Sequence, residues 1–337
     1  MKIVRIITVF IFLSSVLVIS CKNKSGQTEV NPILNEPAVK GITEQIHDDP
    51  TNASLYFRRG NILHKMAIDT LAINDYKKAT KLDSTKAEYF SAVGNILFDH
   101  KDVSGSVEWF EKAIKLDPKD PLSHLKMAKL FYMLKDYTKA MEQVKITLDQ
   151  NRYNAEGYFI LGMVYKDKGD TMRSINSFLS AIQADPKYKE AMIQAGQLYA
   201  TKNDTVAMLY YNNAFKIDTT DVMPLYARGM YWQDHKSYER AKQEYKNCIL
   251  RDNQYAAAYF SMGWILMQQD SLEKALRQFD LVTKIEPNAA DAYYNRGLCN
   301  EEMKKKQEAI NDYKQALIFD PKYQKAKIGL QRLGIKQ

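Results

Sequence analysis

The chain has 337 residues, of which 45% are hydrophobic, 11% aromatic and 26% charged. This is the composition of a folded protein, and it excludes a disordered or collagen-like chain. The net charge of +8 is mildly basic, and three cysteines are too few for a disulfide scaffold. The length would normally predict two or three domains, unless the sequence repeats itself.

Residues 1–20 form a predicted signal peptide. Lys2 and Arg5 give a positive start, and residues 6–19 form an apolar run that stops before Cys21. As a helix this run would span about 21 Å, which is short of the roughly 30 Å hydrocarbon core of a membrane. A cleaved signal is therefore expected rather than a transmembrane anchor.

The end of this run, Val18-Ile19-Ser20-Cys21, resembles a bacterial lipobox. The resemblance implies that Cys21 is lipidated and becomes the mature N-terminus, with the several acyl chains that stable anchoring needs. The alternative is a free or buried cysteine beside an ordinary signal-peptidase site. Lys22 follows in place of an aspartate, and no acidic run comes next. By the same resemblance, we expect the outer membrane, with the protein facing the periplasm.

The next segment, residues 21–37, has no sustained periodicity and is predicted to be a flexible, lipid-anchored tether. Ala38, Val39, Ile42 and Ile46 then recur with helical spacing. Residues 38–52 are therefore predicted to form an N-terminal capping helix and the turn that follows it.

A period of 34 residues, shortened once to 33, governs the rest of the chain. It places glycines at Gly60, Gly94, Gly162, Gly196, Gly229, Gly263 and Gly297. A mostly aromatic column runs through Tyr76, Phe110, Val144, Phe178, Tyr211, Tyr245, Phe279 and Tyr313. Each unit has two amphipathic stretches joined by a polar turn, which predicts a helical hairpin. The glycine is expected where the two helices approach too closely for a larger side chain.

This pattern resembles the tetratricopeptide repeat over residues 53–323, as in Ala292-Tyr293-Tyr294-Asn295-Arg296-Gly297. The eight copies, repeats 1 to 8, are 53–86, 87–120, 121–154, 155–188, 189–221, 222–255, 256–289 and 290–323. The resemblance implies an all-α, right-handed α-solenoid, which residues 324–337 would close as a C-terminal capping helix. Repeat 3 departs from the pattern with Ala128 and Val144, and repeat 5 lacks one residue near Asn203.

Arginine precedes the glycine in three repeats, and each of these repeats carries an acid sixteen residues later. The pairs are Arg59 with Asp75, Arg228 with Glu244, and Arg296 with Asp312. The other five repeats have neither charge at these positions. We therefore predict an ion pair between the two helices of each of these three hairpins.

No catalytic motif stands out in the sequence, which has no Gly-rich phosphate loop, no H-E-x-x-H and no G-x-S-x-G. The five histidines are dispersed, and His124 falls in a helix-packing column, so we expect a core histidine rather than a metal ligand. Cys248 falls in a column of small residues, and Cys299 is too far along the chain for a disulfide with it to be expected. The predictions are no enzyme activity, no cofactor and no metal.

Nucleic acid is an obvious partner to test, because the isoelectric point is about 9.0. The lysines, however, scatter around the helices and alternate with acids, as on a solvated face. An exported protein would also meet no nucleic acid. We therefore predict no nucleic-acid binding.

The resemblance implies that the first helix of each repeat lines a concave groove with the residues just before and after the glycine. The corresponding pairs are Phe57 with Asn61, Ser91 with Asn95, Leu125 with Lys129, Phe159 with Met163, Ile193 with Gln197, Tyr226 with Met230, Phe260 with Trp264, and Tyr294 with Leu298. These predicted lining residues start polar and become apolar and aromatic, which suits extended peptides or a helix. A clamp for C-terminal carboxylates is disfavoured, because Phe57 and Ser91 stand beside Asn61 and Asn95.

The sequence thus predicts a non-enzymatic adaptor that is lipid-anchored in the bacterial cell envelope and binds other envelope proteins in this groove. One alternative is a peptidoglycan or glycan binder that stacks sugars on Tyr226, Phe260, Trp264 and Tyr294. A second alternative is a self-associating scaffold, a homodimer whose groove is filled by another copy.

Overall fold

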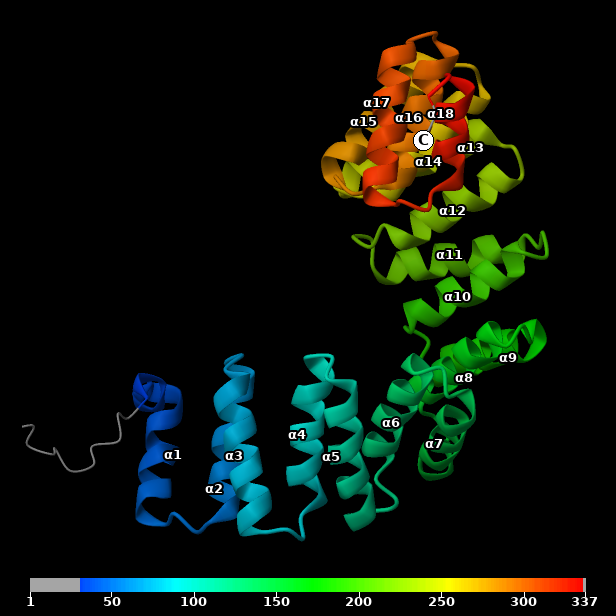
Figure 1. Cartoon of the computed structure of the whole chain (residues 1–337). Coiled ribbons are helices and arrows are strands. Elements are labelled where there is room, and N and C mark those ends of the chain that lie inside the picture. The colour runs from blue at the N-terminus through cyan, green and yellow to red at the C-terminus, as the bar shows by residue number, and fades with distance from the viewer. Residues whose placement is uncertain (1–30, 336–337) are drawn as a thin grey trace, which may run out of the picture. The chain divides into compact units, whose positions relative to one another are not determined.

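The computed structural model describes residues 31–335, and these residues are entirely helical apart from their turns (Figure 1). The all-α prediction is confirmed. The predicted signal peptide 1–20, Cys21 and the beginning of the tether lie outside the described residues.

A short 3-10 helix, η1 (Pro32–Asn35), is followed by eighteen α-helices within the described range. Their bounds are α1 Pro37–Asp48, α2 Ala53–Lys65, α3 Asp69–Leu82, α4 Ala87–Asp99, α5 Val103–Leu116, α6 Pro121–Met133, α7 Tyr137–Gln150, α8 Ala155–Asp167, α9 Thr171–Ala184, α10 Lys189–Ala200, α11 Val206–Ile217, α12 Met223–Asp234, α13 Tyr238–Arg251, α14 Ala256–Gln268, α15 Leu272–Ile285, α16 Ala290–Glu302, α17 Lys306–Phe319 and α18 Gln324–Arg332.

The chain divides after Ile96, inside α4, into two compact units. In the first unit, α2 and α3 form a hairpin, and α1 packs against α2. In the second unit, α6 with α7, α8 with α9, α10 with α11, α12 with α13, α14 with α15 and α16 with α17 form successive hairpins. Each of these hairpins packs against the next through the second helix of one and the first helix of the other.

The helices of a hairpin meet at the glycine column, as the sequence predicts. A Cβ atom added to Gly60 would lie 2.6 Å from a ring carbon of Tyr76, and one added to Gly263 would lie 2.9 Å from the ring of Phe279. No side chain fits at such distances unless the ring moves. The glycines therefore allow the close approach that buries the aromatic column.

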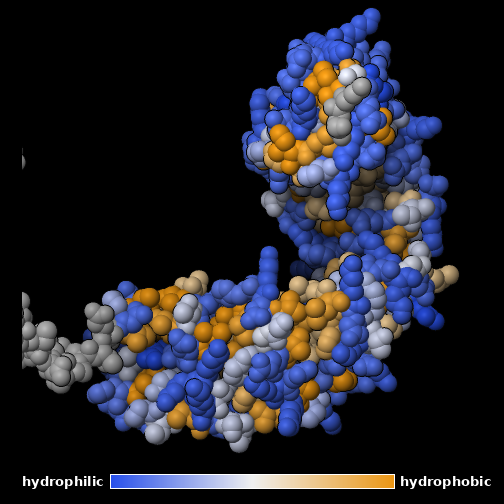
Figure 2. All heavy atoms as spheres, viewed as in Figure 1, coloured by the Kyte–Doolittle hydropathy of each residue, from blue (hydrophilic) through white to orange (hydrophobic). Residues whose placement is uncertain are grey.

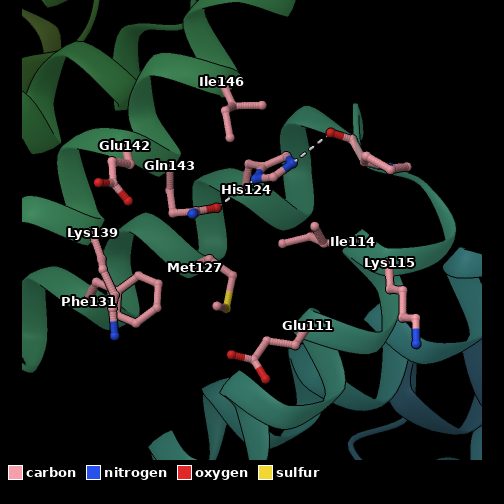
Figure 3. Close-up of a pocket in the computed structure, with 11 residues that line it drawn as sticks. Glu111, Ile114, Lys115, His124, Met127, Phe131, Lys139, Glu142, Gln143 and Ile146 are labelled. Atoms are coloured by element: carbon pink, nitrogen blue, oxygen red, sulfur yellow. Dashed lines mark hydrogen bonds between the residues drawn. The ribbon is translucent and has the colours of Figure 1, made fainter.

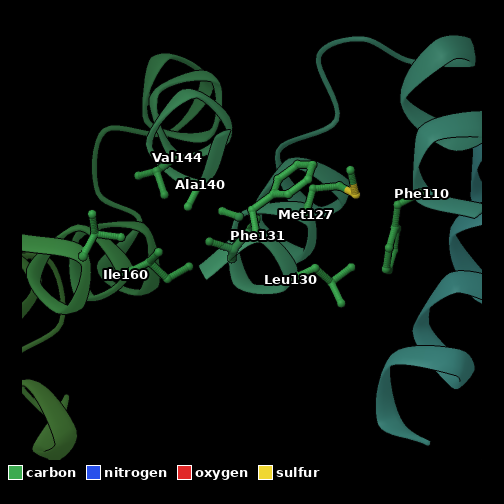
Figure 4. Packing of buried hydrophobic residues seen from close by; sticks show 10 residues of the cluster. Phe110, Met127, Leu130, Phe131, Ala140, Val144 and Ile160 are labelled. Atoms are coloured by element: carbon green, nitrogen blue, oxygen red, sulfur yellow. The ribbon is translucent and has the colours of Figure 1, made fainter. Parts of the chain in front are cut away.

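Repeat 3 packs without a glycine. Ala128 and Val144 are both fully buried there, so a small residue faces a medium-sized one in place of glycine facing an aromatic ring. Figure 4 shows this part of the core, in which Met127, Leu130 and Phe131 of α6 lie between side chains of α5, α7 and α8. The departure from the pattern is thus a paired replacement that conserves packing.

Two kinds of turn set the repeat length. Between the helices of each hairpin, one residue has a left-handed backbone, and this residue is Ala67, Lys101, Lys135, Gly169, Asn203, Lys236, Asp270 or Lys304. Between repeats, an Asp or Asn side chain accepts a hydrogen bond from the backbone N–H two residues later, as in Asp185 with Lys187 at 2.8 Å.

The last helix, α18, packs on the second helix of repeat 8. A Cβ atom added to Gly329 would lie 2.6 Å from the ring of Tyr313, and one added to Gly297 would lie 2.7 Å from the same ring. The Arg332 Nη2 atom of α18 lies 2.7 Å from Glu301 Oε2. A glycine contact and an ion pair thus hold α18 against the apolar face of the last hairpin.

Candidate functional site

The three predicted arginine–acid pairs are all present. Arg59 donates to both oxygens of the Asp75 carboxylate, at 2.7 and 2.8 Å. Arg228 Nη2 lies 2.6 Å from Glu244, and Arg296 Nη2 lies 2.6 Å from Asp312. Asp75 and Asp312 are buried, so their charges depend on these partners.

Each arginine makes a second contact that the sequence analysis missed. Its Nη1 atom donates to a polar side chain sixteen residues earlier, on the helix that precedes its own hairpin. The acceptors are Thr43 at 3.3 Å, Asn212 at 2.8 Å and Asp280 at 3.1 Å. Each arginine therefore joins three helices, and the third contact depends on how neighbouring helices stack.

Repeat 3 has Met127 in place of this arginine, and its groove between the same three helices is larger than that of repeat 8. This open groove of about 580 Å³ lies between α5, α6 and α7, with Met127 where repeats 1, 6 and 8 have arginine. Figure 3 shows Met127 and Phe131 on its apolar side, with Glu111 and Lys139 at its border. The corresponding groove of repeat 8 has a volume of about 390 Å³ and is lined by Arg296, which lies between Asp280 and Asp312.

His124 lies at this groove and is buried, as predicted. Its Nδ1 lies 2.6 Å from Gln143 Oε1, and its Nε2 lies 3.0 Å from the carbonyl oxygen of Pro118 (Figure 3). Both ring nitrogens are engaged within the fold. Within residues 31–335, no group of three or more His, Cys, Asp or Glu side chains could hold a metal ion.

The two described cysteines are buried and unbridged, which agrees with the packing role predicted for Cys248. Burial raises the pKa of both the Cys248 and the Cys299 thiol to about 12. At neutral pH both thiols are therefore protonated and poor nucleophiles.

The predicted lining residues are not an exposed stripe. Leu125 and Ile193 are buried, and the other members of the eight pairs are half-buried. This burial has a physical cause, because the aromatic side chains also pack between successive repeats. On the face shown in Figure 2, apolar side chains gather in patches among hydrophilic ones, so apolar surface remains accessible there.

The aromatic lining residues pack in a regular way. Phe159 lies with its ring centroid 5.6 Å from that of Phe178 in its own hairpin and 5.2 Å from that of Tyr188 before the next hairpin. Tyr226 and Tyr294 have corresponding pairs of ring neighbours. Phe57 packs on Tyr76 and on Tyr89 inside α4, and Phe260 packs on Phe279. One side of each ring is therefore packed against other residues of the array.

Two polar lining residues, Lys129 and Gln197, contact side chains of neighbouring repeats. Lys129 forms an ion pair with Glu156 of the next repeat. Lys166 donates to Gln194 at 2.6 Å and to Gln197 at 3.4 Å. Glu156, Lys166 and Gln194 were missed by the sequence analysis, because these contacts form only when hairpins stack.

The remaining predicted lining residues divide by chemistry. Asn61 accepts a 2.8 Å hydrogen bond from the Tyr76 hydroxyl, while Asn95 Oδ1 is a buried oxygen without a hydrogen-bond partner in the described chain. Met163, Met230, Trp264 and Leu298 pack half-buried against core clusters that join their own repeat to a neighbouring repeat or to α18.

Family models of the tetratricopeptide repeat match residues 53–86, 155–188, 256–289 and 290–323, and a further model of this repeat matches residues 94–135. Together these matches cover more than half of the chain. The chain belongs to the tetratricopeptide repeat family. Proteins of this family generally mediate protein–protein interaction and are typically not enzymes.

The chain is similar to parts of larger curated proteins. The chain is 23% identical over 271 residues to the BBSome complex member BBS4 of Bos taurus, covering 80% of this chain and 51% of the relative. It is 22% identical over 252 residues to the Hsp70-Hsp90 organizing protein 3 of Arabidopsis thaliana, covering 71% and 44%. The chain thus spans about half the length of these relatives.

Solved structures show the same fold. A tetratricopeptide repeat protein from Parabacteroides merdae matches with a TM-score of 0.57 and 15% identity, covering 74% of this chain and 99% of that one. A chain of the APC/C hetero-tetramer Cut9-Hcn1 matches with a TM-score of 0.56 and 13% identity, covering 86% and 57%. None of the helices described here is both long and apolar enough to cross a membrane.

Proposed function

We propose that this tetratricopeptide repeat protein is a non-enzymatic adaptor of the bacterial cell envelope. Lipid on Cys21 would anchor it. The expected location is the outer membrane, with the protein facing the periplasm. The repeats would bind extended peptides or helices of other envelope proteins along the predicted lining residues. The family's general role in protein–protein interaction supports this proposal.

The observation that carries the proposal is the half-burial of the aromatic and methionine lining residues. Packing holds one side of each ring in place, which removes much of the entropy cost of ordering a binding surface. The other side keeps apolar area that a partner can cover. Rigid aromatics beside flexible methionines form a surface suited to peptides of varied sequence.

The binding test is in-cell crosslinking of the native protein followed by affinity purification. The Phe260→Ala, Trp264→Ala double variant should lose specific partners, while Leu250→Ala should retain them. Leu250 is a matched control because its side chain is 80% exposed but lies on α13, away from the predicted lining residues. Circular dichroism confirms that each variant is folded.

Retention of the same partners by the double variant would overturn groove binding. If the purified protein binds cell-wall material in the absence of any protein partner, this result would instead favour the glycan alternative. A dimer in sedimentation that dissociates with Phe260→Asp would favour the self-associating scaffold.

The anchoring part of the proposal has a separate test. Cells fed an alkyne-labelled palmitate analogue should label the native protein, and Cys21→Ala should abolish the label. Fractionation of the membranes and protease treatment of intact cells then determine the membrane and the side. Labelling that persists in the Cys21→Ala variant would contradict the proposed anchor.

A further inference from the structure

A small cavity where repeats 6, 7 and 8 meet combines aromatic walls with carboxylates. Its volume is about 270 Å³, and the rings of Tyr226 and Phe260 line it together with Ala256 and Val282. Glu286 and Asp291 also line it, and both residues are exposed. The cavity therefore opens among the predicted lining residues and carries negative charge.

Glu286 is an exception in the repeat. At the corresponding position the other repeats have Asp or Asn, whose side chain accepts a hydrogen bond from the backbone two residues later. These residues are Asp83, Asp117, Asn151, Asp185, Asp218, Asp252 and Asp320, with distances of 2.8 to 3.2 Å. Glu286 is longer by one methylene, and in the described chain its carboxylate makes no such bond. Its carboxylate is therefore not engaged in the turn, and its negative charge lines the cavity.

Neither carboxylate of this cavity is neutralised by the protein. Across residues 31–335, no lysine, arginine or histidine forms an ion pair with Glu286 or Asp291. The Asp291 carboxylate accepts a hydrogen bond from the backbone N–H of Ala292, through Oδ1 at 2.9 Å. Aromatic ring faces and carboxylates both attract a cation, and their attractions add when they line one cavity.

Repeat 5 shows which group fills the equivalent place. Lys189 stands at the position of Ala256, and its Nζ lies 2.8 Å from Asp218, the counterpart of Glu286. The same Nζ lies 2.8 Å from Asp221. The hydrogen bond from Lys189 holds the pKa of Asp218 well below its usual range. In repeat 7 an alanine stands in place of this lysine, and the carboxylates line an open cavity instead.

We propose that this cavity binds a lysine or arginine side chain of the partner segment, whose ammonium or guanidinium group takes the place that Lys189 fills in repeat 5. The partner is then a segment with a cationic residue next to apolar ones. This inference rests on the proposed groove function, because Tyr226 and Phe260 belong to both surfaces.

The test measures binding of fluorescein-labelled degenerate octapeptide pools to the purified full chain by fluorescence polarisation. One pool has lysine fixed at its fifth position, and the other has acetyl-lysine there. Acetylation removes the charge and keeps most of the side chain, so we expect the lysine pool to bind about tenfold more tightly.

A matched pair of variants locates the effect. Ala256→Lys supplies the chain's own ammonium to the cavity and should weaken binding of the lysine pool about tenfold, to the level of the acetyl-lysine pool. Ala155→Lys adds the same charge at the same position of repeat 4 and should change nothing. Glu286→Gln removes one exposed carboxylate and should weaken the lysine pool about threefold.

The outcomes separate the two proposals. Equal binding of the two pools would overturn the cationic cavity and leave groove binding intact, whereas binding of neither pool would overturn both. Equal weakening by Ala155→Lys and Ala256→Lys would show an effect of net charge alone and would also overturn the cavity. If Ala256→Lys unfolds the chain, unchanged binding by Glu286→Gln is the result that contradicts the proposal.

Discussion

Repeats 3 and 8 build the same hairpin from different interior side chains. In repeat 8, Gly297 packs on Tyr313, and Arg296 pairs with Asp312. In repeat 3, Ala128 and Val144 replace the first pair, while Met127 and Gln143 replace the second. Gln143 then bonds to His124, and the groove beside Met127 has a volume of about 580 Å³, whereas the corresponding groove of repeat 8, which Arg296 lines, has about 390 Å³.

The difference shows that facing interior positions on the two helices of a hairpin change together, as a set. A residue enlarged on one helix is matched by a smaller one on its partner, and a charge is present only with its counter-charge. A change to one member of a set should therefore cost more than a change to both.

The largest effect is expected from Arg296→Met, which gives repeat 8 the residue of repeat 3 at one position only. Asp312 is 5% exposed, so its carboxylate would stay buried with Asn300 as its remaining partner. We expect a loss of about 3 kcal/mol in the free energy of unfolding, measured by urea denaturation.

Arg296→Met with Asp312→Leu is the matched control, because it removes the stranded charge as well. This double variant should recover much of the loss. If it unfolds at the same urea concentration as Arg296→Met alone, the ion pair is not what stabilises the hairpin.

Gly297→Ala introduces the alanine of repeat 3 opposite an aromatic ring. The new Cβ would lie 2.7 Å from a carbon of Tyr313, and Gly329 of α18 packs on this ring as well, so the ring has little room to move. We expect a loss of about 2 kcal/mol by the same denaturation assay. An unchanged midpoint would contradict the packing argument.

Ala128→Gly makes the opposite change in repeat 3 and should cost about 1 kcal/mol, because glycine lowers helix propensity and Val144 does not fill the space. Adding Val144→Phe recreates the glycine–aromatic pair of the other repeats and should recover stability. The coupling energy of this double-mutant cycle measures how strongly the effects of positions 128 and 144 on stability depend on each other. A coupling near zero would show that the two positions vary independently.

The smallest effect concerns Glu301, whose counterpart in repeat 3 is Tyr132. The hydrogen bond from Arg332 lowers the pKa of Glu301 from its ordinary value of 4.5. A lowered folded-state pKa adds stability that is present above pH 4.5 and is lost as the pH falls through the folded-state value. Glu301→Gln should therefore remove about 0.5 kcal/mol at pH 7 and less at pH 3, as thermal melts at the two pH values would show. Equal losses at both would exclude the ion pair as the cause.

Contacts inside one hairpin could be predicted from the sequence, and contacts between hairpins could not. The Gly60–Tyr76 approach and the Arg59–Asp75 pair follow from fixed intervals along two antiparallel helices. The bond from Arg59 to Thr43 and the Lys129–Glu156 pair depend on how neighbouring hairpins stack, which an interval within one repeat does not encode. The same stacking explains why the predicted lining residues are half-buried.

The candidate site could likewise be predicted from the sequence only in part. Burial of His124 and Cys248 was predictable, because both fall in packing columns that the period defines. The role of Glu286 was not, because its difference from aspartate gains meaning only beside the Tyr226 and Phe260 rings. The lipid on Cys21 and the groove's occupant stay predictions.

The hairpin turns leave room for engineering a more robust protein. Seven of the left-handed turn residues in the described range are not glycine, and an L-residue with a side chain pays roughly 1 kcal/mol or more for that conformation. Glycine at exposed turns such as Lys135 and Lys304 would relieve this strain without touching the interior. Glycine substitutions at these turns should therefore raise the thermal stability of the array in small, independent and additive increments.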